Sequence, residues 1–373
     1  MKTFFKTVVV VCIIAATAYN ANSLTKLTQR LEIIETRLGG QSKLAYTATE
    51  TIKKVRRSVV LIIGGESEGS GFAVRKGGFI LTNFHVIAFE PSPKVLLPDG
   101  TFETGKVIMA DKDTDLAVIK IEKDLPALPL MNLKELEPAE ELFAVGYALG
   151  GDLPNVTLTS VGQGIYSGRR TLKEDKVEYI QSNITLVPGM SGGPMVNIRG
   201  EVVGVNTAGF LLGGMGFSIS ADCVREKWKK MASSKDPLKD VEKIEFKPNE
   251  SPLEAVKAFY NYLKVRKLEK AFALLSDHFV KGYSFEQWAK GYEPLLDTSV
   301  IEIKPDKHAE NRIRVKLTTK DLVDNEVVGK LFDGYWDVKK INGQWLLWQP
   351  RIREVKEPSH EWFPEPVPKA VAR

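Results

Sequence analysis

Cysteine and histidine are scarce in this sequence. Its 373 residues include two cysteines and four histidines. Cys12 lies inside an apolar N-terminal stretch, so a bridge to Cys223 is not expected, and a four-cysteine zinc site is excluded by count. Cys223 is interpreted as a small buried hydrophobe, with a catalytic thiol as the weaker alternative. We expect no metal ion and no cofactor.

A long basic block is also missing. The 52 lysines and arginines are interleaved with 47 acidic residues, which gives a net charge of +5. This mixing argues against a nucleic-acid partner. The hydrophobic fraction of 43% and the charged fraction of 27% are typical of soluble globular proteins. The length predicts two or three domains.

One long apolar run is present, at the N-terminus. Residues 7–18 are almost wholly apolar and follow Lys2 and Lys6. This length suits the core of a signal peptide and is short for a membrane span, and Ala16-Thr17-Ala18 fits a cleavage site. A membrane anchor is the alternative, because residues 4–21 extend the run if Lys6 snorkels. Residues 1–23 therefore predict an exported chain that is periplasmic, secreted or anchored to the membrane.

Residues 24–46 contain a short apolar seam with spacings of three and four, formed by Leu24, Leu27, Leu31, Ile34 and Leu38. Gly39 and Gly40 end it. Two heptads fit one amphipathic helix packed on its own domain, or a short coiled coil through which chains associate.

Residues 47–232 show an all-β pattern. Short apolar runs alternate with turn signals such as Gly77-Gly78, Asp99-Gly100 and Arg199-Gly200, which predicts a barrel or sandwich. The expected strands are Ser58–Ile63, Gly71–Val74, Phe79–Asn83, Lys94–Leu97, Leu116–Ile121, Leu142–Tyr147, Val177–Gln181, Met195–Asn197 and Glu201–Asn206. A helix at Cys223–Met231 ends this domain.

A second domain is expected at residues 251–353, after a polar linker at residues 233–250. Ser251 and Pro252 are typical of a helix start, with serine as the N-cap. Two more helical runs and four strands follow, and Asn342-Gly343 predicts a hairpin. This order predicts an α+β domain. Residues 354–373 form a proline-rich tail that we expect to be extended.

The run Gly189 to Pro194 carries the strongest chemical signal. An acyl-transfer serine needs an exposed hydroxyl on a tight turn, with two backbone N–H groups aimed at the oxygen that becomes negative. Ser191 fits the nucleophile, and the N–H groups of Gly189 and Ser191 fit the oxyanion hole. A structural glycine turn is the plainer alternative.

The base and the acid are narrowed by elimination. His85 is the only histidine in the same predicted domain as Ser191, so a base that activates Ser191 must be His85. Asp111, Asp113 and Asp115 crowd one turn. Asp115 adjoins the apolar run that starts at Leu116, where a partly buried carboxylate can fix the histidine tautomer.

Five motifs in order resemble the HtrA-type trypsin-like serine proteases. They are Gly69 to Phe72 (GSGF), Leu81 to Val86 (LTNFHV), Thr114 to Val118 (TDLAV), Pro188 to Asn197 (PGMSGGPMVN) and Gly200 to Thr207 (GEVVGVNT). The resemblance implies a chymotrypsin-like double β-barrel of two six-stranded barrels, with a His85, Asp115 and Ser191 triad in the cleft between them.

The resemblance also implies a specificity pocket. Thr185, Leu186 and Ser218 would wall it, and Asn206, Thr207 and Ala208 would pair with the substrate backbone. No acidic residue stands among them, which predicts cleavage after small or medium aliphatic residues.

Two features depart from the family. Met190 stands where HtrA proteases usually have asparagine and digestive proteases have aspartate, so activation by a new N-terminus is not expected. Instead of the usual PDZ domain, residues 251–353 weakly resemble the cone-shaped nuclear transport factor and ketosteroid isomerase superfamily. Asp277, His278 and Trp288 could line a small-ligand pocket there, and the alternative is that these aromatics are simply core.

The sequence therefore predicts an exported serine endopeptidase that cleaves proteins or peptides, with a role in envelope protein quality control. The main alternative is a weakly active or inactive chaperone or adaptor that binds partners through residues 251–353. A small-molecule enzyme in that domain is a third reading. The protease domain and residues 24–38 would both allow a homotrimer.

Overall fold

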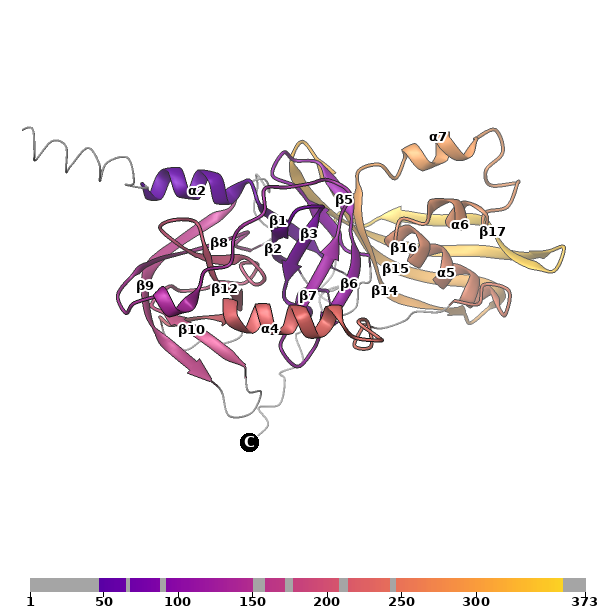
Figure 1. The fold of residues 1–373 in the computed structure, drawn as a ribbon. Coiled ribbons are helices and arrows are strands. Elements are labelled where there is room, and N and C mark those ends of the chain that lie inside the picture. Colours follow the sequence, from indigo (N-terminus) through magenta and orange to yellow (C-terminus); the bar gives the residue numbers. More distant parts are fainter. Residues whose placement is uncertain are drawn as a thin grey trace, which may run out of the picture. The chain divides into compact units, whose positions relative to one another are not determined.

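The computed structural model describes residues 47–64, 68–87, 92–149, 158–171, 177–207, 214–241 and 246–357. Two β-rich regions and an α+β region follow one another along the chain (Figure 1). Among these residues, no helix has both the length and the apolar character needed to cross a bilayer. The predicted signal or anchor segment, the leucine seam and most of the proline-rich tail lie outside the described ranges.

The first β-rich region follows helix α2 (Ala48–Arg56) and is one sheet of short strands. Its strands are β1 (Val59–Ile63), β2 (Glu68–Arg75), β3 (Phe79–Thr82), β4 (Lys94–Leu96), β5 (Phe102–Thr104), β6 (Lys106–Asp111) and β7 (Leu116–Lys120). They pair in the order β5-β4-β1-β2-β3-β7-β6. Every residue of β1 is buried, as expected for a strand covered on both faces. The described sheet has seven strands instead of the six that the resemblance implies, because β5 adds a three-residue edge beside β4.

The second β-rich region is a closed six-stranded barrel. It consists of β8 (Glu141–Gly146), β9 (Ser160–Thr171), β10 (Glu178–Ser182), β11 (Pro194–Asn197), β12 (Val202–Thr207) and β13 (Gly216–Ser220), in the order β10-β13-β12-β11-β8-β9. Closure leaves no free strand edge in this barrel. A 3-10 turn, η1 (Leu133–Glu135), precedes it, and α4 (Ala221–Ala232) follows with the Ser220 hydroxyl accepting from the Cys223 N–H at 3.1 Å. The predicted all-β fold with a further domain is confirmed as double-barrel-like, and among the described strands the second region is the one that closes into a barrel.

Strands β5, β6 and β9 were not predicted from the sequence. Strand β9 is the clearest case, because its twelve residues are mostly glycine, serine and polar side chains with exposed positions in alternation. It still pairs with both β8 and β10. Tertiary pairing, not local hydrophobicity, forms this strand.

The stretch expected to be a linker contacts the first sheet. The Pro237 carbonyl accepts from the Ala110 N–H at 2.9 Å, and the Asp240 carboxylate accepts from the Lys112 N–H at 3.3 Å. Val241 is 6% exposed and belongs to the first sheet's core. Residues 237–241 are therefore packed against the sheet, whereas residues 233–236 are exposed.

The C-terminal region is an α+β domain. Its elements are α5 (Pro252–Lys264), α6 (Leu268–Phe272), α7 (Phe285–Lys290), β14 (Leu295–Asp306), β15 (Ala309–Val323), β16 (Glu326–Ile341) and β17 (Gln344–Glu354). Ser251 caps α5 by accepting from the Glu254 N–H at 3.1 Å, as predicted. The strands form an antiparallel sheet in sequence order, and β16 turns into β17 at Asn342-Gly343, both at positive φ. The hairpin prediction is confirmed.

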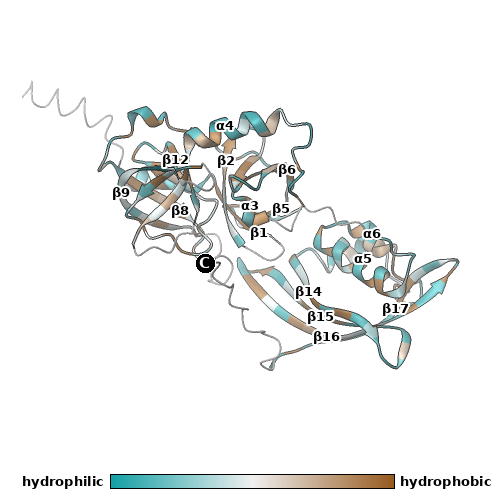
Figure 2. Ribbon diagram, turned by 90° about the horizontal axis from the view of Figure 1, so that it is seen from below, coloured by the Kyte–Doolittle hydropathy of each residue, from teal (hydrophilic) through white to brown (hydrophobic). Residues whose placement is uncertain are grey.

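Helices α5 and α6 lie on one face of this sheet (Figures 1 and 2). The core between them includes Phe259, Val315, Trp336 and Leu347. The Trp336 indole N–H donates to the buried Tyr260 hydroxyl at 2.9 Å. Each large apolar side chain buried here contributes about 1.5–3 kcal/mol. The opposite face of the sheet carries the alternate residues.

A largely buried ion pair joins α5 to β14. Lys264 Nζ lies 3.3 Å from Asp297 Oδ1, with side-chain exposures of 17% and 7%. The Ser299 hydroxyl donates to Asp297 Oδ2 at 2.9 Å and accepts from Lys264 Nζ at 3.2 Å. The added hydrogen bonds satisfy the pair, which a buried charge requires.

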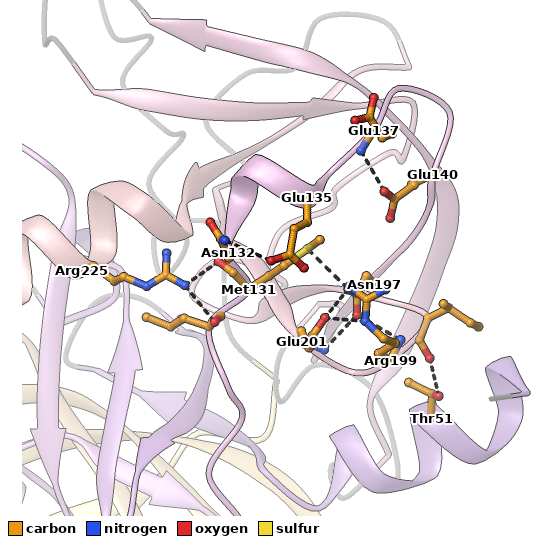
Figure 3. Close-up of polar contacts among 12 residues, drawn as sticks. Thr51, Met131, Asn132, Glu135, Glu137, Glu140, Asn197, Arg199, Glu201 and Arg225 are labelled. Atoms are coloured by element: carbon orange, nitrogen blue, oxygen red, sulfur yellow. Dashed lines mark hydrogen bonds and ion pairs between the residues drawn. The ribbon is translucent and has the colours of Figure 1, made fainter. Parts of the chain in front are cut away.

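The hairpin turn between β11 and β12 is held by Asn197 (Figure 3). Its Oδ1 accepts from the N–H groups of Arg199 and Glu201, each at 3.0 Å, and its Nδ2 donates to the Glu201 carboxylate at 2.8 Å. Arg199 also donates to that carboxylate at 2.7 Å. Burial alone would raise the pKa of Glu201, but the hydrogen bonds from Asn197 and Arg199 lower it overall. The Thr51 hydroxyl closes the network by donating to the Ile198 carbonyl at 2.7 Å.

Candidate active site

His85 lies on a single helical turn, α3 (Phe84–Ile87), one residue after β3. Phe84, Val86 and Ile87 are buried, so the turn presents His85 outward, and its side chain is 47% exposed. His85 Nδ1 lies 2.8 Å from Asp115 Oδ2 and 3.0 Å from Oδ1. The His85 backbone N–H donates to Oδ1 at 2.9 Å. The carboxylate thus fixes both the ring and the turn that carries it.

Asp115 is held in an uncommon backbone conformation. Its φ is 53°, in the left-handed region that non-glycine residues rarely adopt. The Asn83 side-chain Nδ2 donates to the Asp115 carbonyl at 2.9 Å, and the Asp115 N–H donates to the Lys112 carbonyl at 3.2 Å. Asn83 is fully buried, and its Oδ1 has no hydrogen-bond partner in the described part of the chain. Asn83 therefore acts as a fixed donor for Asp115.

Ser191 stands in a glycine turn of positive φ. Gly189 has φ 87° and Gly192 has φ 83°, conformations that favour glycine. A Cβ at Gly192 would lie 2.1 Å from the Ser70 carbonyl and 2.3 Å from Thr82 Oγ1. Glycine is needed here because the turn approaches the first sheet too closely for any side chain.

Ser70 on β2 connects the glycine turn around Ser191 to both β-rich regions. Its N–H donates to the Ser191 carbonyl at 2.7 Å, and its hydroxyl donates to the Gly189 carbonyl at 2.7 Å. The same hydroxyl accepts from the Tyr147 N–H at 2.8 Å. Ser70 and Asn83 lie within two of the motifs, GSGF and LTNFHV, but no role was predicted for either residue. The motifs contain both residues, and only the structure shows that both are buried.

Met190 packs inward. It is 3% exposed and lies in the second barrel's core with Ile184 and Leu186. An apolar contact thus supports the turn from below, at the position where an acidic residue would seek a charged partner.

The residues expected to bind substrate differ in their exposure. Thr185 is exposed, whereas Leu186, Asn206 and Ser218 are buried. The Ser218 hydroxyl donates to Asn206 Oδ1 at 3.1 Å, so these two side chains bond each other.

The Asn206 backbone supports the glycine turn around Ser191 directly. Its N–H donates to the Gly193 carbonyl at 2.8 Å, and its carbonyl accepts from the Gly192 N–H at 2.9 Å. Thr207 pairs with Phe217 at the end of β12. Ala208 lies outside the described residues.

The predicted pocket of the C-terminal domain is brought together only in part. A cavity of about 600 Å³ is lined by Trp288 with Phe279, Val280, Tyr283, Gln287, Gly291 and Tyr292. Asp277 and His278 are not among its lining residues. His278 instead stacks on Trp348, with ring centroids 4.3 Å apart. Burial raises the pKa of Tyr292 to about 12.

The β-rich part of the chain is similar to known proteins. Residues 69–205 match the family model for a trypsin-like peptidase domain. The double barrel is a trypsin-like peptidase domain. The chain is 41% identical over 166 residues to a probable periplasmic serine endoprotease DegP-like from Hahella chejuensis, covering 42% of this chain and 34% of that protein.

Other relatives match the same peptidase domain. A putative serine protease HhoB from Synechocystis is 39% identical over 145 residues, which cover 38% of this chain and 35% of that protein. A DegP-like endoprotease from Chlamydia muridarum is 34% identical over 227 residues, covering 59% of this chain and 43% of the relative. The chain therefore spans well under two thirds of the length of these relatives. A solved structure of an HtrA-type protease, AlgW, with a tripeptide matches with a TM-score of 0.46 and 26% identity, over 50% of this chain and 64% of the other.

Proposed function

We propose that this chain is a serine endopeptidase in which Ser191 is the nucleophile, His85 the general base and Asp115 the residue that orients the base. The contact of the Asp115 carboxylate with His85 Nδ1, at 2.8 and 3.0 Å, carries the proposal. A carboxylate in this place keeps the proton on Nδ1 and leaves Nε2 free to accept one.

The proposed reaction has two stages. His85 takes the proton of Ser191 Oγ as that oxygen attacks the peptide carbonyl, and then gives it to the leaving amine. The N–H groups of Gly189 and Ser191 bind the carbonyl oxygen as it becomes negative. A water molecule, deprotonated by His85, then hydrolyses the acyl-enzyme and regenerates Ser191.

Two structural features support a preformed oxyanion hole. The Pro188 carbonyl accepts from the Leu149 N–H at 2.8 Å, which fixes the direction of the peptide unit that carries the Gly189 N–H. Met190 fills the core below the turn. Because donors that need no reorganisation stabilise the transition state best, we expect the site to be active without proteolytic processing.

The setting of the activity is also proposed. The DegP-like relatives are named probable periplasmic endoproteases, and the apolar stretch at residues 7–18 agrees with export. We propose that the chain acts on proteins in the cell envelope and takes part in their quality control. Cleavage after small or medium aliphatic residues follows from the absence of an acid among Thr185, Leu186 and Ser218.

A fluorophosphonate probe tests the nucleophile. Wild type and a Ser234→Ala control, which alters an exposed serine, should label and degrade casein equally. Ser191→Ala should do neither. Casein degradation by purified Ser191→Ala at the wild-type rate would refute the triad, and partner binding by a wild type that does not turn over casein would favour the adaptor alternative.

A further inference from the structure

The outer face of the C-terminal sheet holds a basic pocket unrelated to the triad. It has a volume of about 490 Å³ and is lined by residues of β15, β16 and β17, which are Arg314, Asp333, Gly334, Tyr335, Pro350, Arg351, Ile352 and Arg353. Three arginines face one aspartate there. In the described part of the chain no other carboxylate lines this pocket.

Strand register places these charges on the face away from the helices. Arg314 is opposite Tyr335, which is opposite Arg351, and Asp333 is opposite Arg353. Ile313 and Val315, the neighbours of Arg314, belong to the core under α5. Since side chains alternate between faces along a strand, the arginines project from the other face. Figure 2 shows the corresponding alternation of hydrophilic and hydrophobic residues along these strands.

Among the residues that the structure describes, the arginines of the pocket lack the close carboxylate partner that the neighbouring Arg312 has. Arg312 makes a two-point contact with Asp337, at 2.8 and 3.3 Å. Arg314 approaches Asp333 Oδ1 only at 3.7 Å, and that buried oxygen has no hydrogen-bond partner among the described residues. Within those residues Arg351 and Arg353 form no ion pair. Their guanidinium groups are donors that an acidic ligand would satisfy.

The spacing of the arginines indicates which kind of acidic ligand fits the pocket. Arg351 and Arg353 are two residues apart on one strand, about 7 Å, which is the distance between same-face side chains of an extended peptide. Arg314 lies two strands away from Arg351, about 10 Å. A pocket of about 490 Å³ is far larger than an inorganic phosphate needs and suits several side chains.

A nucleotide base finds little room to stack. Arg312 Cζ lies 3.9 Å from the centre of the Tyr335 ring, and Arg351 Cζ lies 6.0 Å from it. Cations from the strands on both sides of β16 already cover the one aromatic ring of the pocket. Base recognition by stacking needs a free ring face.

We propose that this pocket binds an acidic polypeptide segment in extended conformation, with two carboxylate side chains two residues apart on Arg351 and Arg353. Glycine is needed at position 334 beside the pocket, because a Cβ there would lie 2.0 Å from the Arg351 carbonyl of the neighbouring strand. The site does not involve Ser191, so it binds whether or not the chain cleaves peptides.

Fluorescence polarisation of a labelled peptide tests the proposal. The full chain carrying Ser191→Ala is titrated into fluorescein-labelled Ser-Gly-Glu-Ser-Glu-Gly-Ser at low salt, and binding is expected. Arg351→Gln/Arg353→Gln should weaken it at least about tenfold, because two charge-assisted contacts are lost. Lys290→Gln/Lys307→Gln removes the same charge from exposed positions of the same domain and should leave the affinity within about twofold.

Several outcomes would overturn the proposal. Equal weakening in both double variants would mean that net charge alone attracts the peptide. Equal binding of the Gln-for-Glu peptide would remove the role of carboxylates. Binding of phosphatidylglycerol vesicles that depends on Arg351 and Arg353, without peptide binding, would assign the face to a membrane. Circular dichroism of each variant verifies that the sheet is intact.

Discussion

Asn83 offers the sharpest test of how the candidate active site is held together. Replacing it by alanine deletes the 2.9 Å hydrogen bond from its Nδ2 to the Asp115 carbonyl. A buried acceptor left without its partner costs about 1–3 kcal/mol. Asp115 depends on this support more than most residues would, because its φ of 53° is intrinsically unfavourable. The carboxylate that contacts His85 should therefore lose its fixed position.

The expected effect falls on catalysis more than on stability. If the full 1–3 kcal/mol appears in the transition state, kcat/KM falls roughly 5- to 150-fold. The stability loss is smaller, about 1 kcal/mol, because alanine also removes the buried Asn83 Oδ1 that has no partner among the described residues. The assay is initial-rate hydrolysis of fluorescein-casein at limiting substrate, with the melting temperature measured in parallel.

Asn197→Ala is the matched control. It also removes a buried asparagine, but one that accepts from the Arg199 and Glu201 N–H groups in the β11–β12 turn. It should lower the melting temperature more than Asn83→Ala and leave kcat/KM within about twofold, because a lost turn cap acts on folding. If activity in the two variants simply follows their melting temperatures, Asn83 has no positioning role.

Three further outcomes are expected. Gly189→Ala forces a residue with a side chain into a φ of 87° and should displace one oxyanion donor. In the same casein assay kcat should fall about 10²-fold or more, with little change in KM. A normal kcat would place the oxyanion hole elsewhere. Burial raises the pKa of the Cys223 thiol to about 11, so little of it is thiolate at pH 8. In a Cys12→Ser background, iodoacetamide at pH 8 should therefore alkylate the native chain roughly 100-fold more slowly than the unfolded chain. Equal rates would contradict the buried thiol. Asp297→Asn leaves the largely buried Lys264 charge without its carboxylate and should lower the stability of the C-terminal domain by about 3 kcal/mol, measured in thermal melts. The double variant Lys264→Met/Asp297→Leu removes both charges and should lose less stability. A larger loss in the double variant would contradict the pairing.

The features that the sequence predicted well are those encoded over a few neighbouring residues. The glycine turn around Ser191, the Ser251 helix cap and the Asn342-Gly343 hairpin each depend on local backbone preferences. Apolar strands were recognisable because burial on both faces makes them continuous hydrophobic runs. Strand β9 was not recognisable, because it has few apolar residues and forms through pairing with β8 and β10.

The roles of Ser70 and Asn83 could not be read from the sequence for a related reason. Ser70 contacts residues 119 and 77 positions away, and Asn83 contacts one 32 positions away. A serine or asparagine beside a glycine or a threonine is common in any turn, and only the tertiary fold shows which carbonyl it meets. The same holds for the basic pocket, whose arginines come from two strands and meet only through the register of the strand between them.

The nucleophile turn ties the proposed chemistry to the packing of both β-rich regions. On one side Ser70 and the space left by Gly192 fix the turn to the first sheet, where His85 and Asp115 lie. On the other side Met190 is part of the second barrel's hydrophobic core. An ion pair at that position could be formed or broken by processing or pH, whereas a buried methionine responds only to the packing around it. The position that departs most from the family pattern therefore favours a site whose shape is set when the barrels fold.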